Sequence, residues 1–147
     1  MVALLPRLFF QHFNDTSWVK EDDGEIVGFL VGFRSQTYGD TGYIHFVGVD
    51  PSYSVRSKGL GGQLYQQFFQ AMRNNGRHIV EVITSPINRG SIAFHTRLGF
   101  TIVPGDGLLD AVPVHRNYDG RGGDRVIFRK VLAANATTLT KGNSLPS

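Results

Sequence analysis

A glycine-rich turn with basic residues is the first stretch of this sequence whose composition suggests chemistry. It reads Arg56-Ser57-Lys58-Gly59-Leu60-Gly61-Gly62, after an apolar stretch typical of a strand and before a pattern typical of a helix. The first backbone N–H groups of a helix have no intrahelical partner and lie at the positive end of the helix dipole. Such a turn suits a phosphate or diphosphate group, and glycine keeps side chains away from the anion. Taken alone, the turn is also compatible with an ordinary strand-to-helix connection.

A second stretch, residues 88–100, combines a helical pattern with polar side chains. It reads Asn-Arg-Gly-Ser-Ile-Ala-Phe-His-Thr-Arg-Leu-Gly-Phe. We expect a helix that Ser91 caps and that ends at Gly99. Its histidine, His95, is the only side chain of the stretch that titrates near neutral pH.

The two stretches together resemble the signatures of the GNAT superfamily of acyl-CoA-dependent N-acyltransferases. The family's first motif, Arg/Gln-x-x-Gly-x-Gly/Ala, is matched by Arg56, Gly59 and Gly61. Its second motif is an Asn, then Ser or Ala three residues on, then an aromatic pair and Leu-Gly-Phe. The matching residues are Asn88, Ser91, Phe94, Leu98, Gly99 and Phe100. The resemblance covers roughly residues 14 to 132.

The resemblance implies a site for acetyl-CoA as the acyl donor. In the family the diphosphate lies on the glycine turn, and the pantetheine arm runs along the central strand and adds amide hydrogen bonds. Carried onto this sequence, the arm would lie along Val47, Gly48 and Val49, and the amide of Asn88 would bind it. The residues of the turn would be Arg56, Ser57, Lys58, Gly59, Leu60, Gly61 and Gly62. Asn88 also suits a second role, as the cap of the helix that follows.

The resemblance also implies direct attack of an amine on the thioester. A backbone N–H of Val47 or Val49 would stabilise the developing oxyanion, so Val49 is included among the catalytic candidates. The family places a tyrosine hydroxyl directly after the residue that matches Phe94, to protonate the departing thiolate. Here that position is His95, which either transfers a proton or is a helix-surface residue near the cofactor with no proton role.

Two residues on expected strands are candidates for the base that takes the amine's proton. Glu81 lies within Ile79-Val80-Glu81-Val82, where a carboxylate facing a cleft would suit the task. A solvent-facing residue that alternates with apolar ones is the other interpretation of Glu81. His45, between apolar neighbours, is either a second candidate base or a packed residue with satisfied hydrogen bonds.

Composition narrows the class of protein. The 147 residues suffice for one domain, and 41% are hydrophobic and 18% charged, as in globular proteins. The chain has no cysteine, which excludes a thiolate nucleophile and fits a reducing compartment, so we expect a cytoplasmic protein. The net charge of +3 is dispersed, and no apolar run is long enough for a bilayer. We therefore expect neither a nucleic-acid partner nor a membrane.

The order of elements predicts an α/β (α+β) fold with a mostly antiparallel sheet flanked by helices. Periodicity predicts helices over residues 4–13, 62–74 and 91–98. The second carries a stripe interpreted as core packing, formed by Leu64, Tyr65, Phe68, Phe69 and Met72. It predicts strands over residues 16–20, 26–34, 43–49, 78–84, 100–103 and 124–132, the first two forming a hairpin. We expect a domain over residues 1–132 and a flexible tail over residues 133–147.

Two features depart from an ordinary member of the family. The first strand and helix that the family fold implies are not recognisable, so either they are missing or the sequence starts late; an exposed sheet edge would then need a cover, for example in a homodimer. The connection over residues 104–123 is longer than usual and is expected to face a substrate or partner. Asp110 and Asp119 in it would attract an amine, whereas Asp110, His115 and Asp119 match no metal-ligand spacing, so no metal site is predicted.

These observations predict an N-acetyltransferase that moves an acetyl group from acetyl-CoA to a primary amine of a small molecule or a protein, in a ternary complex. The alternative from a different class is an acyl-CoA-binding sensor without turnover. It stays open because the family's tyrosine is replaced and the N-terminal elements are not recognisable. Release of free thiol in the presence of amines would separate the two.

Overall fold

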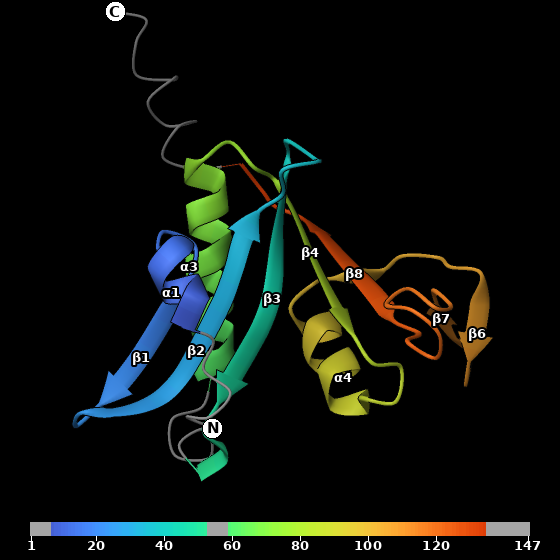
Figure 1. The fold of residues 1–147 in the computed structure, drawn as a ribbon, viewed down its shortest axis with the longest axis horizontal. Helices are drawn as coiled ribbons and strands as arrows, with labels where there is room; N and C mark the ends of the chain where they lie inside the picture. The colour runs from blue at the N-terminus through green and yellow to red at the C-terminus, as the bar shows by residue number, and fades with distance from the viewer. Residues whose placement is uncertain (1–6, 53–58, 135–147) are drawn as a thin grey trace, which may run out of the picture.

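The structure, a computed structural model, describes residues 7–52 and 59–134 and contains a six-stranded sheet with the strand order β1-β2-β3-β4-β8-β5 (Figure 1). Only β3 and β4 are parallel; the other neighbours are antiparallel. The strands of this sheet are β1 (Trp18–Asp22), β2 (Glu25–Arg34), β3 (Thr41–Val49), β4 (Ile79–Thr84), β5 (Thr101–Ile102) and β8 (Val126–Val131). The helices are α1 (Arg7–His12), α3 (Leu60–Asn74) and α4 (Arg89–Arg97). The predicted fold class is confirmed.

The β1–β2 hairpin forms where the sequence predicts it. Its two turn residues, Asp23 and Gly24, have φ angles of 51° and 78°. Positive φ at both positions matches the right-handed twist of the flanking strands, and Asp-Gly is a preferred pair for such a turn.

Helix α3 covers one face of the sheet and forms the main core. Its apolar stripe is fully buried, as the helical spacing predicts, and consists of Leu60, Leu64, Tyr65, Phe68, Phe69 and Met72. The facing strands carry glycine where the helix comes closest: a Cβ atom at Gly32 would lie 2.6 Å from the Phe68 ring. The same face of the sheet supplies Leu30, Ile44, Val80 and Val82.

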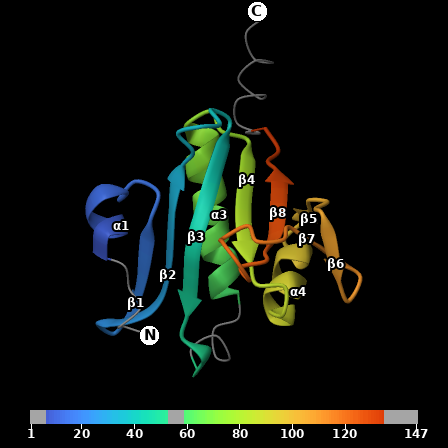
Figure 2. The same cartoon turned by 45° about the vertical axis from the view of Figure 1, so that its right-hand side comes forward.

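The opposite face of the sheet is covered on the β1–β3 side by α1 (Figure 2). Phe9 of α1 is buried against Phe29 and Val31 of β2. The ring of His45 stacks on Phe9 with a centroid distance of 5.1 Å but is otherwise exposed. The interpretation of His45 as a packed residue therefore holds for one face of its ring only.

A β-bulge in β3 reverses which side chains face α3. Val31 pairs with Phe46 but Gly32 pairs with Ile44, so His45 is the extra residue. Before the bulge Ile44 belongs to the core under α3, and after it Val47 and Val49 pack on that same core. Phe46 faces the other way, with its ring 5.8 Å from Phe29.

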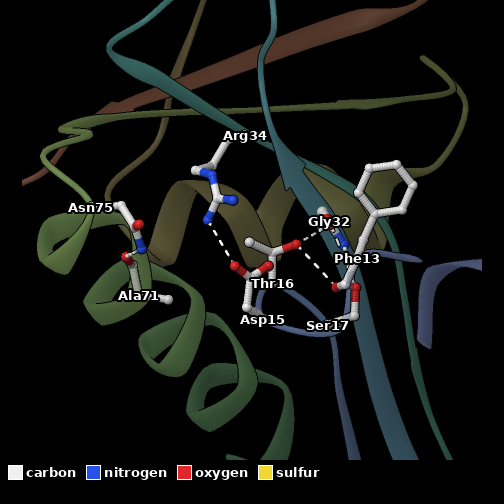
Figure 3. A network of polar contacts seen from close by, with 8 residues as sticks. All are labelled: Phe13, Asp15, Thr16, Ser17, Gly32, Arg34, Ala71 and Asn75. Atoms are coloured by element: carbon white, nitrogen blue, oxygen red, sulfur yellow. Dashed lines mark hydrogen bonds and ion pairs between the residues drawn. The ribbon is translucent and has the colours of Figure 1, made fainter. Parts of the chain in front are cut away.

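The backbone of β2 at this bulge is held by two hydroxyl side chains from the segment that follows α1 (Figure 3). The buried Thr16 Oγ1 donates to the Gly32 carbonyl at 2.6 Å, and the Gly32 N–H donates to Ser17 Oγ at 3.3 Å. An ion pair at 3.0 Å between Arg34 and Asp15 flanks them. These contacts fix α1 and the start of β1 to the strand beside the bulge.

The connection over residues 104–123 contains a hairpin that the sequence did not predict. Strands β6 (Gly107–Leu109) and β7 (Val112–Val114) pair antiparallel around Asp110 and Ala111, whose φ angles are 49° and 67°. Alanine carries no sequence signal for a positive φ angle, and Pro113 is atypical of a strand. The prediction of a plain loop is therefore wrong for residues 107–114.

The six-stranded sheet has β1 at one edge and β5 at the other. Among the described residues, β1 pairs only with β2. The expectation that a partner subunit, such as a second copy, or another part of the molecule covers this edge stays a prediction. Of the expected tail, residues 135–147 lie outside the described residues.

Candidate active site

Strands β3 and β4 separate beyond the bulge and leave a cavity between them. Their parallel pairing joins Thr41–Ile44 to Ile79–Val82 and goes no further. The cavity beyond has a volume of about 280 Å³. His45 and Phe46 line it from one side of the sheet, and Tyr65 and His95 line it from the side of α3 and α4. The gap therefore connects the two faces of the sheet.

A larger cavity, of about 850 Å³, lies at the start of α3. Gly59 caps the helix in a left-handed conformation, with φ 93°, and among the described residues no side chain caps the helix by a hydrogen bond. Gly61 and Gly62 of the first turn line the cavity with Gly59. Apart from their chain neighbours and the backbone of the helix itself, no described heavy atom lies within 4 Å of a Cβ atom placed at Gly59 or Gly62. The first N–H groups of a helix lack intrahelical partners and lie at the positive end of its dipole, and with open space beside them they fit a diphosphate.

The structure brings most of the described cofactor-binding candidates to this cavity. Val47, Val49, Leu60 and Asn88 line it together with the three glycines. Gly48 faces the other side of the sheet, where a Cβ atom would lie 2.5 Å from the Phe29 ring, so only its backbone is available. Arg56, Ser57 and Lys58 lie outside the described residues. At the far end of α4, the exposed Arg97 also lines the cavity and supplies a positive charge.

The cap of α4 is Asn88 rather than Ser91. The Ser91 backbone N–H donates to Asn88 Oδ1 at 3.0 Å, and the helix starts at Arg89. The prediction of Ser91 as the cap is therefore wrong, and the interpretation of Asn88 as a cap is confirmed. The predicted end of the helix is confirmed, since Gly99 has a φ angle of 91° directly after the last turn.

His95 is buried, with 5% of its surface exposed, so its interpretation as a helix-surface residue is wrong. Its ring stacks on Phe128 at 4.6 Å. Nδ1 lies 2.7 Å from the Ser91 carbonyl oxygen, and Nε2 lies 2.7 Å from Tyr65 Oη. Burial lowers the pKa of His95, and the bond to the Ser91 backbone offsets this only in part.

Tyr65 is a residue of this site that the sequence interpretation treated as core packing alone. It is 2% exposed, burial raises its pKa, and among the described residues its hydroxyl bonds to His95. A tyrosine in a stripe of Leu and Phe signals such a contact, because a buried hydroxyl needs a polar partner. The sequence does not reveal which partner that is.

Glu81 lies in the half of β4 that is paired with β3, level with Tyr43. Arg129 of β8 stands opposite and donates to Glu81 Oε2 from Nε at 2.9 Å and from Nη2 at 2.7 Å. The side chain of Glu81 is 22% exposed. A role as base stays a proposal, and it would require the carboxylate to act while bound to Arg129.

The acidic residues of the 104–123 connection occupy two different places. Asp119 pairs with Arg125 at 2.9 Å, and Asp110 pairs with Arg89 at 3.6 Å. Burial and then the charges of Tyr118, Asp119 and Glu81 raise the pKa of Tyr43 to about 12, so Asp119 is close enough to Tyr43 of β3 to act on its hydroxyl. Within the described residues, no three His, Asp or Glu side chains gather to hold a metal ion, and no helix has the length and apolarity to cross a bilayer.

Comparison with known proteins gives a family and several relatives. A model of the acetyltransferase (GNAT) family matches residues 3–100. An L-2,4-diaminobutyric acid acetyltransferase of Nocardia farcinica is 34% identical over 86 residues, which are 58% of this chain and 44% of that protein. The enzyme of the same name from Shouchella clausii is 32% identical over 88 residues, 60% of this chain and 48% of that protein. The chain thus spans about half the length of these curated relatives.

Solved structures share the fold. Ard1 from Thermoplasma volcanium has a TM-score of 0.69 at 20% identity and covers 90% of this chain and 80% of its own. The structure of yncA from Salmonella typhimurium, with its cofactor acetyl-CoA, has a TM-score of 0.57 at 24% identity, with 81% and 65% covered.

Proposed function

Because the chain belongs to the acetyltransferase (GNAT) family, we propose that it transfers the acetyl group of acetyl-CoA to a primary amine. The observation that carries this proposal is that the two cavities adjoin and share part of their lining. Five residues line both of them: Val47, Tyr65, Asn88, Ser91 and His95. A molecule with its diphosphate at Gly59 therefore has a continuous path to the gap between β3 and β4.

The backbone of β3 suits the arm of acetyl-CoA. Past Ile44 the edge of β3 that faces β4 no longer pairs with it, so N–H and C=O groups there are available to an amide-containing chain. A backbone N–H of Val47 or Val49 would then donate to the thioester oxygen as negative charge develops on it. Acetyl-CoA supplies the activated acyl group, and the sequence has no cysteine for a covalent thiol-linked acyl-enzyme.

The amine would enter from the face of the sheet opposite α3. His45 and Phe46 line the gap from that side. We propose direct attack in a ternary complex, since donor and acceptor can approach the gap from opposite faces. The acceptor is an amine of a small molecule or a protein; L-2,4-diaminobutyrate belongs among the first candidates because two matched relatives carry that name.

Two measurements test the proposal. Calorimetry with acetyl-CoA and CoA tests the donor site, and binding is expected. Release of free thiol is then followed with a panel containing L-2,4-diaminobutyrate, polyamines and peptides with free N-termini. Thiol release that depends on one of these amines, with the acetylated product seen by mass spectrometry, is the expected result. Binding without amine-dependent release across the panel would instead favour the sensor.

A further inference from the structure

Hydrogen bonding fixes the proton on His95. The Ser91 carbonyl oxygen can only accept, so Nδ1 at 2.7 Å from it must carry the hydrogen. Ser91 Oγ lies 3.2 Å from the same nitrogen. In the neutral ring Nε2 is then unprotonated, and it accepts from the Tyr65 hydroxyl at 2.7 Å. His95 at rest therefore has no hydrogen to give directly from Nε2; the nearest hydrogen belongs to Tyr65.

The surroundings of the imidazole favour this neutral form. Phe128 of β8 stacks on the ring, and Phe94 of its own helix and Phe100 meet it edge to face. Tyr65 of α3 is the one titratable side chain among the described ring contacts of His95. No described carboxylate contributes to the shift of the His95 pKa, which burial lowers. A proton on Nε2 would be held briefly, because nothing there compensates its charge.

The pair lies where the two cavities meet, since Tyr65 and His95 line both. We propose that Tyr65 and His95 form a proton relay, in which the Tyr65 hydroxyl exchanges protons with the reactants and His95 Nε2 stores one. This inference rests on the proposed acetyl transfer. In this relay His95 does not protonate the departing thiolate directly, as its position in the family motif would imply. It acts through the hydroxyl of Tyr65.

The relay conserves atoms and charge. As the amine nitrogen bonds to the acyl carbon, Tyr65 Oη takes the proton leaving that nitrogen and passes its own hydrogen to His95 Nε2. When the carbon–sulfur bond breaks, the electron pair stays on sulfur. His95 Nε2 then returns its proton to Tyr65 Oη, whose hydrogen goes to the sulfur. An amide and a free thiol result, and both side chains are neutral as at the start.

The test uses Tyr65→Phe, which keeps the ring in the core and removes the hydroxyl. We expect kcat to fall by about 100-fold or more, within the range for loss of an acid–base group, while the affinity for acetyl-CoA in calorimetry stays within about threefold. His95→Gln can accept the Tyr65 hydrogen bond but cannot store a proton, and it should lose kcat similarly. Tyr38→Phe, at a 63% exposed tyrosine of a loop, is the matched control and should match the wild type.

A second readout does not depend on turnover. Nitrogen-15 NMR of the free protein at neutral pH should show His95 protonated at Nδ1 and unprotonated at Nε2. A hydrogen on Nε2, or a Tyr65→Phe variant with wild-type kcat, would overturn the relay and leave the proposed transfer standing. A wild-type protein that binds acetyl-CoA but acetylates no amine overturns the proposed function, and the relay with it.

Discussion

The β3–β4 pair has two halves that differ in backbone pairing: a closed half, in which the strands are hydrogen-bonded to each other, and an open half, in which they are apart. In the closed half, Thr41–Ile44 and Ile79–Val82 satisfy each other's backbone groups, and Ile44, Val80 and Val82 fill the core under α3. In the open half, Val47 and Val49 still face α3, but the strands have parted and a cavity replaces the ladder. Backbone groups that are not paired with a neighbouring strand need another partner. The open half can therefore bind the amide groups of a ligand.

The difference between the halves comes from one residue. His45 adds a position to β3 without adding one to β2, which turns the strand and restores apolar side chains to the α3 side after the bulge. The sheet thereby opens without losing its core. The variants proposed below each change a residue in or beside one of the two halves, and the measured quantities are stability, acetyl-CoA affinity and KM.

Deletion of His45 should have the largest effect. Without the extra residue, β3 would pair with β2 in an unbroken register, Phe46 opposite Val31 and Ile44 opposite Gly32, so Val47 would still face α3 but the bend and added twist of the bulge would be lost. We expect the gap between β3 and β4 to narrow and acetyl-CoA binding to disappear, measured by calorimetry, while chemical denaturation shows that the protein still folds.

The control is His45→Ala, which keeps the number of residues in β3 and removes the ring that stacks on Phe9 and lines the gap. It should cost about 0.5–1.5 kcal/mol. A deletion variant that binds acetyl-CoA as tightly as His45→Ala would show that the bulge does not open the gap between β3 and β4.

Gly59→Ala should weaken the donor site at the helix end of the open half. A left-handed φ angle costs a residue with a Cβ atom about 1–2 kcal/mol, so the turn would shift and redirect the N–H groups. We expect the acetyl-CoA dissociation constant to rise about tenfold, as 1.4 kcal/mol corresponds to that factor. Calorimetry measures it.

Gly76→Ala supplies the matched comparison for this glycine. Gly76 follows the other end of α3, has a φ angle of 73° and likewise has no heavy atom within 4 Å of a Cβ position. Both variants should lose similar stability, but only Gly59→Ala should lose affinity. Equal affinities would mean that the start of α3 does not bind the cofactor.

Features with a local signal could be predicted from the sequence. The Asp23-Gly24 turn, the apolar stripe of α3 and the end of α4 at Gly99 each depend on residues next to one another in the chain. The two family motifs, likewise local, led to the described glycines and Asn88 that line the larger cavity.

Features that depend on distant pairing could not be predicted. The bulge at His45 exists only relative to β2, and the bond between Tyr65 and His95 joins residues 30 positions apart. Glu81 has the alternation of a strand residue, yet its partner Arg129 is 48 positions away. In each case the single sequence shows the residue type but not the neighbour that sets its role.

The stability of the protein should fall in acid in a way that depends on His95. Burial lowers its pKa in the folded state below the unfolded value near 6.5, so the unfolded chain binds the proton more readily. The free energy of unfolding should therefore be highest above pH 6.5 and decrease below it, by at most about 1.4 kcal/mol per pH unit, until the folded pKa is passed. Denaturation curves at several pH values between 7.5 and 5 measure this.

His95→Gln should remove that part of the pH dependence, whereas His78→Gln, at an exposed histidine, should retain it. A profile unchanged by His95→Gln would indicate that the imidazole is charged, or open to water, in the folded protein.

Charge reversal at Asp119 should have the smallest effect, and the same change at Asp110 is the comparison. Asp119 contributes to the environment of Tyr43, whereas Asp110 lies at the β6–β7 turn beside Arg89. A surface charge is worth up to about 1 kcal/mol, so Asp119→Lys should raise KM for a cationic amine about threefold to fivefold and leave acetyl-CoA affinity unchanged. Asp110→Lys should change KM by less than about twofold, because Asp110 and its partner Arg89 are both highly exposed and an exposed charge interacts weakly. Asp119→Asn removes the charge but keeps an oxygen for Arg125, and should give an intermediate KM.

If Asp110→Lys raises KM more than Asp119→Lys does, the amine approaches over the β6–β7 hairpin instead of over the face of the sheet that carries Tyr43.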